Sequence, residues 1–417
     1  FGQYWDGNIT LGAHSTIRGD NNFYIDGVIS GSSKNLTKTG TGAVILRGTN
    51  TYSGTTTVSA GTLNIGGSGS LGSGTYAGNI SNSGTFAYSS STAQTLSGVI
   101  SGSGALTKSG SSTLTLSGTN TYSGITRVNS GTVSISSLSN LGNSTATLAG
   151  GTLKTTSSIT TGNGTVINLD GDSSVEVGSG TFNLKGKFLG NGRLTKTGSG
   201  TLTLGNSSQN NNWSGGLTIN AGKVKALKDR AFGAIPDNFD SDNIIVENGS
   251  SIDFGTVSFT FNSNRGISLA NSGSNSGFIV GKSRTISIPG VISGDGGLTK
   301  TGQGVLDIQG ANTYTGDTAV NNGNLKVSGS LGSGSYAGNI SVSDTRSINY
   351  AGSSTQTFSG TISGEGKVIQ SGSGQLVLTG TNTYSGSTTI SAGTLTLSGS
   401  GNLGNGSYAG AIVNNGT

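Results

Sequence analysis

The 417-residue chain contains no cysteine, no methionine, two prolines and one histidine. Without cysteine there is no disulfide framework, no thiol nucleophile and no thiolate-bound metal. A single histidine, His14, also excludes a metal site built from several imidazoles. The complete absence of thiols suits an exported protein, which must cross an oxidising compartment without mispaired cysteines.

Charge is equally scarce, at 9% of residues, and the formal net charge is +5. The densest basic stretch, 223–230, is followed by Asp237, Asp240 and Asp242, so we interpret the surface as nearly neutral and expect no nucleic-acid partner. Low charge and 30% hydrophobic residues at fixed spacings argue against disorder. No run of 18 apolar residues is present, which excludes a membrane-spanning helix.

Helix-forming residues never gather with a 3.6-residue period, and glycine, 77 residues in all, interrupts every candidate helix. Thr, Val, Ile, Leu and Tyr instead form runs of three to six bounded by Gly, Asn or Ser. This pattern is typical of short strands joined by turns, and it predicts an all-β fold.

An internal repeat organises the whole sequence. The motif Asn-Thr-Tyr-Ser-Gly or its Thr variant recurs 70 residues apart in two pairs, and a degenerate copy holds Trp213 in place of Tyr. The four full copies are Asn50–Gly54, Asn120–Gly124, Asn312–Gly316 and Asn382–Gly386. A second motif containing Tyr-Ala-Gly occurs at Leu71–Ser81 and Leu331–Ser341, with a variant at Leu403–Ile412.

Five units follow from these motifs, opening near residues 28, 99, 188, 291 and 361. The extra length of the interior units falls around Thr145–Leu184 and Leu227–Ile288, which are still strand-like. We therefore predict that residues 1–417 form one continuous solenoid, with additional coils in the long units and no separate globular domain.

Side-chain alternation predicts how the repeat folds. In Thr113–Gly118, Leu114 and Leu116 point one way and the threonines the other, so one face is buried. Strands this short must stack on neighbouring coils to bury that face. At about 20 residues per coil the chain would hold roughly 20 coils of a parallel β-helix. A β-propeller and a run of β-sandwiches are the antiparallel alternatives, and both fit the 70-residue spacing poorly.

The repeat resembles a known family. Leu36–Gly42 together with Asn50–Leu63, and the later copies, are similar to the autotransporter-associated β-strand repeat of bacterial type V secreted passenger domains. Ala231–Phe239 with Asn264–Leu269 resembles a longer version of the unit. The resemblance covers essentially the whole chain and implies a right-handed parallel β-helix, secretion by a Gram-negative bacterium, and an outer membrane-associated or released extracellular location.

Candidate chemistry is weak, and we predict no catalytic, cofactor-binding or metal-binding residues. A Ser–His–Asp triad would have to use His14, and Gly-x-Ser-x-Gly-like strings such as those around Gly102–Gly104 arise by chance in so Gly/Ser-rich a chain. Some carboxylates could in principle catalyse glycoside cleavage, and Gly294–Gly297 resembles part of a calcium-binding repeat. Both are better explained as turn residues. The carboxylate candidates are Asp170 with Asp172, Asp240 with Asp242, and Asp253.

Trp5, Trp213 and the tyrosines of the repeat could stack on sugars. Because Tyr52, Tyr122, Tyr314 and Tyr384 share one repeat position, packing at a solenoid corner is the favoured interpretation.

The function expected from these observations is a non-enzymatic, structural and adhesive rod: the passenger stalk of a surface protein that mediates adhesion or aggregation. Its expected partners are host or neighbouring-cell surfaces or copies of itself, with glycans among the candidates, and no cofactor is expected. One alternative is a subunit of an extracellular sheath, layer or filament, and another is a polysaccharide-processing enzyme. Because Phe1 is not a Met start and Leu403–Thr417 breaks off within a motif, we expect a longer parent chain, or a partner covering that end.

Overall fold

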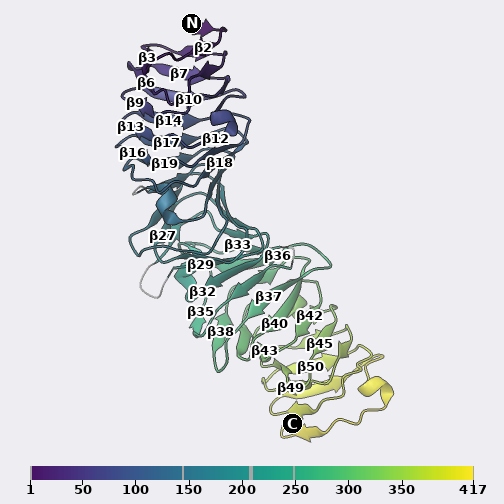
Figure 1. Cartoon of the computed structure of the whole chain (residues 1–417). Coiled ribbons are helices and arrows are strands. Elements are labelled where there is room, and N and C mark those ends of the chain that lie inside the picture. Colours follow the sequence, from purple (N-terminus) through teal and green to yellow (C-terminus); the bar gives the residue numbers. More distant parts are fainter. Residues whose placement is uncertain (1, 143–144, 206–209, 248, 417) are drawn as a thin grey trace. The chain divides into compact units, whose positions relative to one another are not determined.

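The structure is a computed structural model that describes residues 2–142, 145–205, 210–247 and 249–416. Two compact units, Phe1–Gly200 and Thr201–Thr417, divide the chain. In each unit short strands stack into ladders, and every strand pair that the structure describes is parallel (Figure 1). The predicted all-β parallel solenoid is therefore confirmed, and the two antiparallel alternatives are wrong. That the chain forms one continuous solenoid stays a prediction.

The first unit contains three long ladders and three strand pairs. The first ladder is β1 (Gln3–Trp5), β4 (Phe23–Ile25), β7 (Ala43–Leu46), β10 (Thr62–Ile65), β14 (Thr85–Tyr88), β17 (Ala105–Lys108), β19 (Thr126–Val128), β21 (Ala146–Leu148), β24 (Val166–Leu169) and β27 (Lys187–Gly190). The second is β12 (Thr75–Tyr76), β15 (Gln94–Leu96), β18 (Thr113–Leu116), β20 (Thr132–Ile135), β22 (Thr152–Thr155), β25 (Ser173–Val177) and β28 (Leu194–Thr197). The third is β3 (Ser15–Arg18), β6 (Leu36–Thr39), β9 (Thr56–Val58), β13 (Ile80–Asn82) and β16 (Ile100–Ser101). The pairs are β2 (Ile9–Thr10) with β5 (Ile29–Ser30), β8 (Thr49–Asn50) with β11 (Ser70–Leu71), and β23 (Ile159–Thr160) with β26 (Thr181–Leu184).

The second unit is built in the same way. Its first ladder is β31 (Leu217–Ile219), β33 (Asp240–Val246), β36 (Arg265–Leu269) and β39 (Ile292–Ser293). The second is β29 (Thr201–Leu204), β32 (Lys223–Ala226), β34 (Ser251–Asp253), β37 (Asn275–Ile279), β40 (Gly297–Thr301), β42 (Thr318–Val320), β45 (Ile340–Val342) and β48 (Ile362–Ser363). The third is β35 (Phe259–Thr260), β38 (Thr285–Ile288), β41 (Val305–Ile308), β43 (Asn324–Val327), β46 (Ser347–Tyr350), β49 (Lys367–Gln370), β51 (Thr388–Ile390) and β53 (Ile412–Asn414), and the fourth is β44 (Ser335–Tyr336), β47 (Gln356–Phe358), β50 (Gln375–Leu378) and β52 (Thr394–Leu397). This unit also contains β30 (Asn212–Trp213).

Short 3-10 turns are the helical elements of the described residues, and each follows a strand at a corner of a coil. They are η1 (Gly72–Gly74), η2 (Leu138–Leu141), η3 (Asp229–Phe232), η4 (Gly332–Gly334) and η5 (Gly404–Gly406). No helix in the described part of the chain is long and apolar enough to cross a membrane.

The length of one coil follows from the pairing register. In the first ladder Tyr24 pairs with Ile45, Ile45 with Asn64, and Asn64 with Ala87, so successive partners are 21, 19 and 23 residues apart. The coil of about 20 residues expected from strand and turn lengths is thereby confirmed. Corners absorb the difference in length, because the strands themselves remain in register.

The core is a stack of inward side chains from successive coils. In β18 Leu114 and Leu116 are buried, and they pair with the buried Val133 and Ile135 of β20, as the alternation predicts. The long interior segments contain further strands of the same ladders, including β25 and β36. Thr417, Phe1 and position 248 inside the second long segment lie outside the described residues.

Candidate binding groove and buried polar rows

The sequence candidates for catalysis occupy turns. His14 is exposed at a corner, where its Nδ1 accepts a hydrogen bond from the Asn35 backbone N–H at 3.1 Å. Asp170 forms an ion pair with Arg127 at 2.8 Å, and Asp172 accepts the backbone N–H of Arg193 at 2.8 Å. Asp172 therefore links neighbouring coils, and Asp170 reaches across one intervening coil.

In the second acidic pair, Asp240 accepts hydrogen bonds from the side-chain amide of Asn243 at 3.0 Å and from the backbone N–H of Asp242 at 3.3 Å. The separate candidate Asp253 accepts the backbone N–H of Gly255 at 2.8 Å. The Asp of Gly294–Gly297 lies in the turn between β39 and β40. Within the described residues no group of three or more His, Cys, Asp or Glu side chains could hold a metal ion. The absence of catalysis itself stays a prediction.

The aromatic candidates divide in two. Tyr52, Tyr122, Tyr314 and Tyr384 are fully buried, so the packing interpretation is confirmed for them. Trp213 is also buried, and its indole N–H donates to the Gly216 carbonyl at 2.8 Å. Trp5 is 51% exposed, although its register with the buried Ile25 places it on the inward side of β1.

An outward column of side chains, which sequence reasoning missed, forms a groove on the first coils. Tyr4, Tyr24, Ile45, Asn64 and Ala87 follow one another along the pairing register of β1, β4, β7, β10 and β14. The column begins with two large rings and ends with a methyl group, so the surface is hollow beneath the rings. A signal was present in the sequence: these are non-inward positions of strands, and the first two are aromatic.

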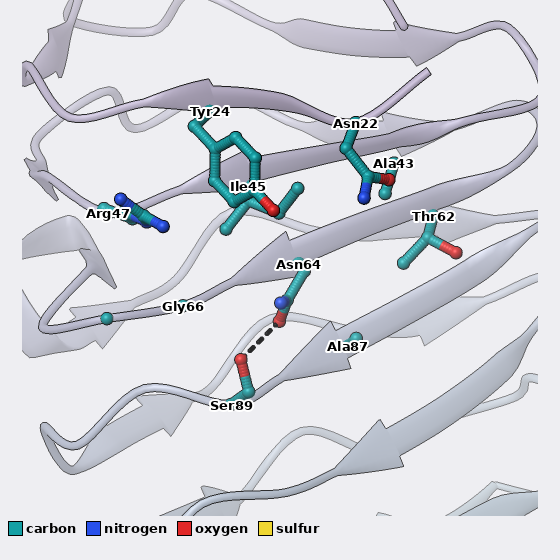
Figure 2. A pocket seen from close by; sticks show the side chains of 11 residues that line it. Asn22, Tyr24, Ala43, Ile45, Arg47, Thr62, Asn64, Gly66, Ala87 and Ser89 are labelled. Atoms are coloured by element: carbon teal, nitrogen blue, oxygen red, sulfur yellow. Dashed lines mark hydrogen bonds between the residues drawn. The ribbon is translucent and has the colours of Figure 1, made fainter. Parts of the chain in front are cut away.

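The groove encloses about 390 Å³. Figure 2 shows Tyr24 and Arg47 along one edge and Asn64 with Ser89 along the other. Its remaining lining comes from Asn22, Ala43, Ile45, Thr62, Gly66, Gly67 and Ala87. The Ser89 hydroxyl donates to Asn64 Oδ1 at 3.0 Å, which fixes the orientation of the amide.

Aromatic stacking and one cation hold the upper edge of the groove. The Tyr4 and Tyr24 rings stack with centroids 4.7 Å apart and planes 10° from parallel. The Arg47 guanidinium carbon lies 4.4 Å from the Tyr24 centroid and 5.7 Å from that of Tyr4. Arg47 also reaches Asp26 at 3.4 Å, so a carboxylate balances its charge beside the groove.

The same repeat position is closed in the fourth unit. There Asp307 and Lys326 stand where the first unit has Ile45 and Asn64, and the two side chains approach to 3.4 Å. Asp307 also accepts hydrogen bonds from Ser328 at 2.7 Å and Gln309 at 3.0 Å. An internal polar network therefore occupies the surface that is an open groove in the first unit.

Comparison with known proteins bears on this architecture. The family described as passenger-associated-transport-repeat matches five segments: residues 36–65, 106–135, 194–226, 298–327 and 368–397. Over 461 aligned residues the chain is 30% identical to the adhesin BmaC autotransporter of Brucella suis biovar 1 (strain 1330), a match that covers 96% of this chain and 11% of the adhesin. The chain is a passenger repeat protein of the autotransporter type.

Other relatives share shorter stretches of passenger repeat. An extracellular serine protease of Serratia marcescens is 46% identical over 77 residues, which cover 18% of this chain and 6% of the protease. The chain thus spans a small part of the length of the relatives that it matches. No solved structure matches it. As a passenger repeat protein it is secreted, to the cell surface or the extracellular space.

Each full copy of the Asn-Thr-Tyr motif contributes a buried polar group to the passenger repeat. Asn312 accepts the Ile292 backbone N–H at 2.9 Å and donates to the carbonyls of Gly310 and Ser330 at 2.8 and 3.0 Å. Asn50, Asn120 and Asn382 make the corresponding bonds between coils. The buried amide therefore replaces strand hydrogen bonds where the chain turns a corner.

The tyrosine of the motif completes a second buried network. The Tyr314 hydroxyl lies 2.8 Å from Thr318 Oγ1, which in turn lies 2.8 Å from the Tyr336 hydroxyl of the next coil. Burial raises the pKa of Tyr314 to about 12. The equivalent pairs Tyr52–Thr56, Tyr122–Thr126 and Tyr384–Thr388 span 2.8, 2.6 and 2.6 Å.

Four of the five passenger repeats also bury a lysine, which sequence reasoning did not single out. Lys38, Lys108, Lys196 and Lys300 are at most 1% exposed. The Lys300 ammonium donates to the carbonyls of Thr301, Gly302 and Asn322 at 2.8, 2.7 and 3.0 Å. Strand alternation could have revealed this burial, because the lysine stands two residues after an inward leucine.

Burial lowers the pKa of Lys108, Lys196 and Lys300 to about 8, because an ammonium group loses its hydration inside the solenoid. The surrounding carbonyls accept hydrogen bonds from the charged form, which remains the main form at pH 7. In the fifth repeat Gln370 takes this place, and its amide donates to the carbonyls of Gly372 and Gly374 at 3.1 and 2.7 Å.

Proposed function

We propose that this chain is a non-enzymatic, structural and adhesive segment of an outer membrane-associated passenger, which presents outward side chains to another surface. The partner would be a host or neighbouring cell, or a second copy of the protein. Support comes from the passenger repeats and from a relative named as an adhesin.

One structural observation carries the proposal. The strand after each full or degenerate motif has an aliphatic inward residue, Leu or Val, and a variable outward one. Leu63, Val133, Val224 and Leu325 are fully buried at the inward position. The next residue of the five repeats points away from the core and is partly exposed except for the buried Ser134: Asn64, Ser134, Lys225, Lys326 and Thr396. Packing therefore determines which residue types can occupy the inward position, whereas the outward position can vary and can be used for contact with another surface.

Adhesion can be tested with latex beads coated with the purified 417-residue chain. We expect coated beads to bind cultured epithelial cells, or one another, more than beads coated with the urea-denatured chain. Equal binding of the two preparations would contradict the proposal. Incubation of the chain with polysaccharide and protein substrates supplies the second arm, in which released products would show that the segment is an enzyme.

A further inference from the structure

We propose that the groove between Tyr24 and Asn64 binds a neutral saccharide. The inference rests on the proposed adhesive function and specifies the chemistry of one contact site. A sugar presents both C–H groups and hydroxyls, and the groove pairs an aromatic side chain with hydrogen-bonding groups on the opposite edge.

The hydrogen-bonding groups of the groove are positioned in advance. Because Asn64 Oδ1 is held by the Ser89 hydroxyl, the amide nitrogen has a fixed direction. Within the described part of the chain this Nδ2 has no acceptor, so it remains available to a ligand hydroxyl. Asn22 and Thr62 add polar side chains to the same lining.

Charge selects a neutral ligand over an acidic one. Arg47 is the cation of the groove, and Asp26 compensates it at 3.4 Å. Both side chains remain about one third exposed, at 37% and 36%, so the guanidinium N–H groups can also donate hydrogen bonds to a ligand hydroxyl. The groove lining contains no carboxylate, which removes the attraction that a cationic ligand would require.

Small residues provide the space. Ala43, Gly66 and Ala87 belong to the lining and carry no bulky side chain. A Cβ atom added at Gly66 would lie 2.9 Å from Ile45 Cγ2 and 3.4 Å from Asn64 Nδ2. Any side chain at this position would therefore fill the part of the groove that adjoins the free amide.

An array of immobilised oligosaccharides, with the fluorescently labelled 417-residue chain as the probe, tests the inference. The array carries neutral glucans, galactans, mannans and N-acetylglucosamine oligomers, with sialylated and sulfated sugars as the contrast. We expect retention on at least one neutral class. Loss of ring contact in Tyr24→Ala and loss of the amide in Asn64→Ala should each weaken retention about tenfold.

Two further variants separate binding from folding. Ala87→Trp removes nothing from the core and fills the groove from an outward position, so it should abolish retention while the circular dichroism spectrum is unchanged. Lys326→Ala changes the equivalent of Asn64 in the fourth unit, where that position forms an ion pair with Asp307 and no tyrosine of the described chain lies beside it on the outward side, and should bind as the wild type does.

Three results would overturn the inference: no retention on any neutral sugar, retention undiminished by Ala87→Trp, or retention restricted to sialylated or sulfated sugars. The bead assay keeps the two proposals apart. Beads coated with Ala87→Trp that still adhere would leave adhesion standing without this groove. If the chain retains sugars but its beads do not adhere, the sugar-binding inference is supported and the proposed adhesive function is contradicted.

Discussion

Replacement of Lys300 by glutamine should remove most of the rise in stability of the second unit between pH 7 and pH 9.5. In the described residues of that unit Lys300 is the one lysine whose side chain is fully buried. Gln370 shows that the passenger repeat accepts glutamine at this position, with hydrogen bonds to the same kind of corner carbonyls. Lys300→Gln therefore removes a titrating charge while it keeps donors within the cage.

The magnitude follows from the displaced titration. Burial, with a smaller contribution from the Arg346 charge, lowers the pKa of Lys300 from 10.5 to about 8. Between these values the unfolded chain binds more protons than the folded chain, so the free energy of unfolding rises with pH. The stabilisation is complete above pH 10.5 and is lost as pH falls through 8. Its full extent is about 3 kcal/mol, of which about 2 kcal/mol is gained between pH 7 and pH 9.5.

Urea unfolding followed by Trp213 fluorescence measures this gain. Trp213 is buried in the second unit, and a Trp5→Phe background removes the other tryptophan. We expect the wild type to gain about 2 kcal/mol from pH 7 to pH 9.5 through Lys300. Lys300→Gln should keep only the smaller gain from Lys228, whose pKa burial also lowers. Lys326→Gln is the matched control, because that lysine is 40% exposed and should leave the gain intact.

Two outcomes would refute this reasoning. An equal gain in Lys300→Gln and wild type would show that the buried ammonium does not set the slope. A wild type that becomes less stable between pH 7 and pH 9.5 would show that the carbonyl cage holds the proton more tightly than water does, in which case hydrogen bonding outweighs desolvation.

Three further outcomes are expected. Asn312→Leu leaves the Ile292 N–H without its acceptor and removes one of the two donors to each of the Gly310 and Ser330 carbonyls, so urea unfolding should show a loss of about 2 kcal/mol; a loss below 1 kcal/mol would mean that water replaces the amide. Gly323→Ala places a methyl group at φ +71° and 2.2 Å from the Gly304 carbonyl oxygen, so calorimetry should show a lower Tm, and an unchanged Tm would contradict the steric argument. Because the pKa of Tyr314 is raised to about 12, its stabilisation is full below pH 10 and is lost as pH rises through 12; the unfolding free energy should therefore pass through a maximum near pH 10 and decline less steeply in Tyr314→Phe.

The strands were predictable because their signal is local. In Thr113–Leu116 the inward and outward residues can be read from four letters, and the parallel pairing follows from strands too short to bury a face alone. The buried Lys108 is a different case. Alternation places it inside, but lysine is seldom buried, and the carbonyl cage that accepts it exists only after neighbouring corners have stacked.

The outward positions of the groove residues could be predicted from the sequence, but their alignment into a groove could not, because it depends on the register between coils. Tyr24, Ile45 and Asn64 are 21 and 19 residues apart, and a slip of one residue would turn the column inward. Coil lengths differ by a few residues at the corners, so the alignment of outward side chains is not encoded by a fixed spacing. The ion pair between Arg127 and Asp170, 43 residues apart, was hidden for the same reason.

The parallel ladders also determine how the protein responds to force. Each coil is held by hydrogen bonds to the coils before and after it, about 20 residues away in the chain. A pull on one end of a unit therefore loads the terminal coil first, and the coils behind it remain paired until that coil has detached. One released coil of about 20 residues lengthens the chain by roughly 65 Å. A passenger anchored to a cell and attached to a surface would in this way dissipate tension stepwise and act as an extensible tether. Its detached coils can pair again with the coil behind them when the load is removed.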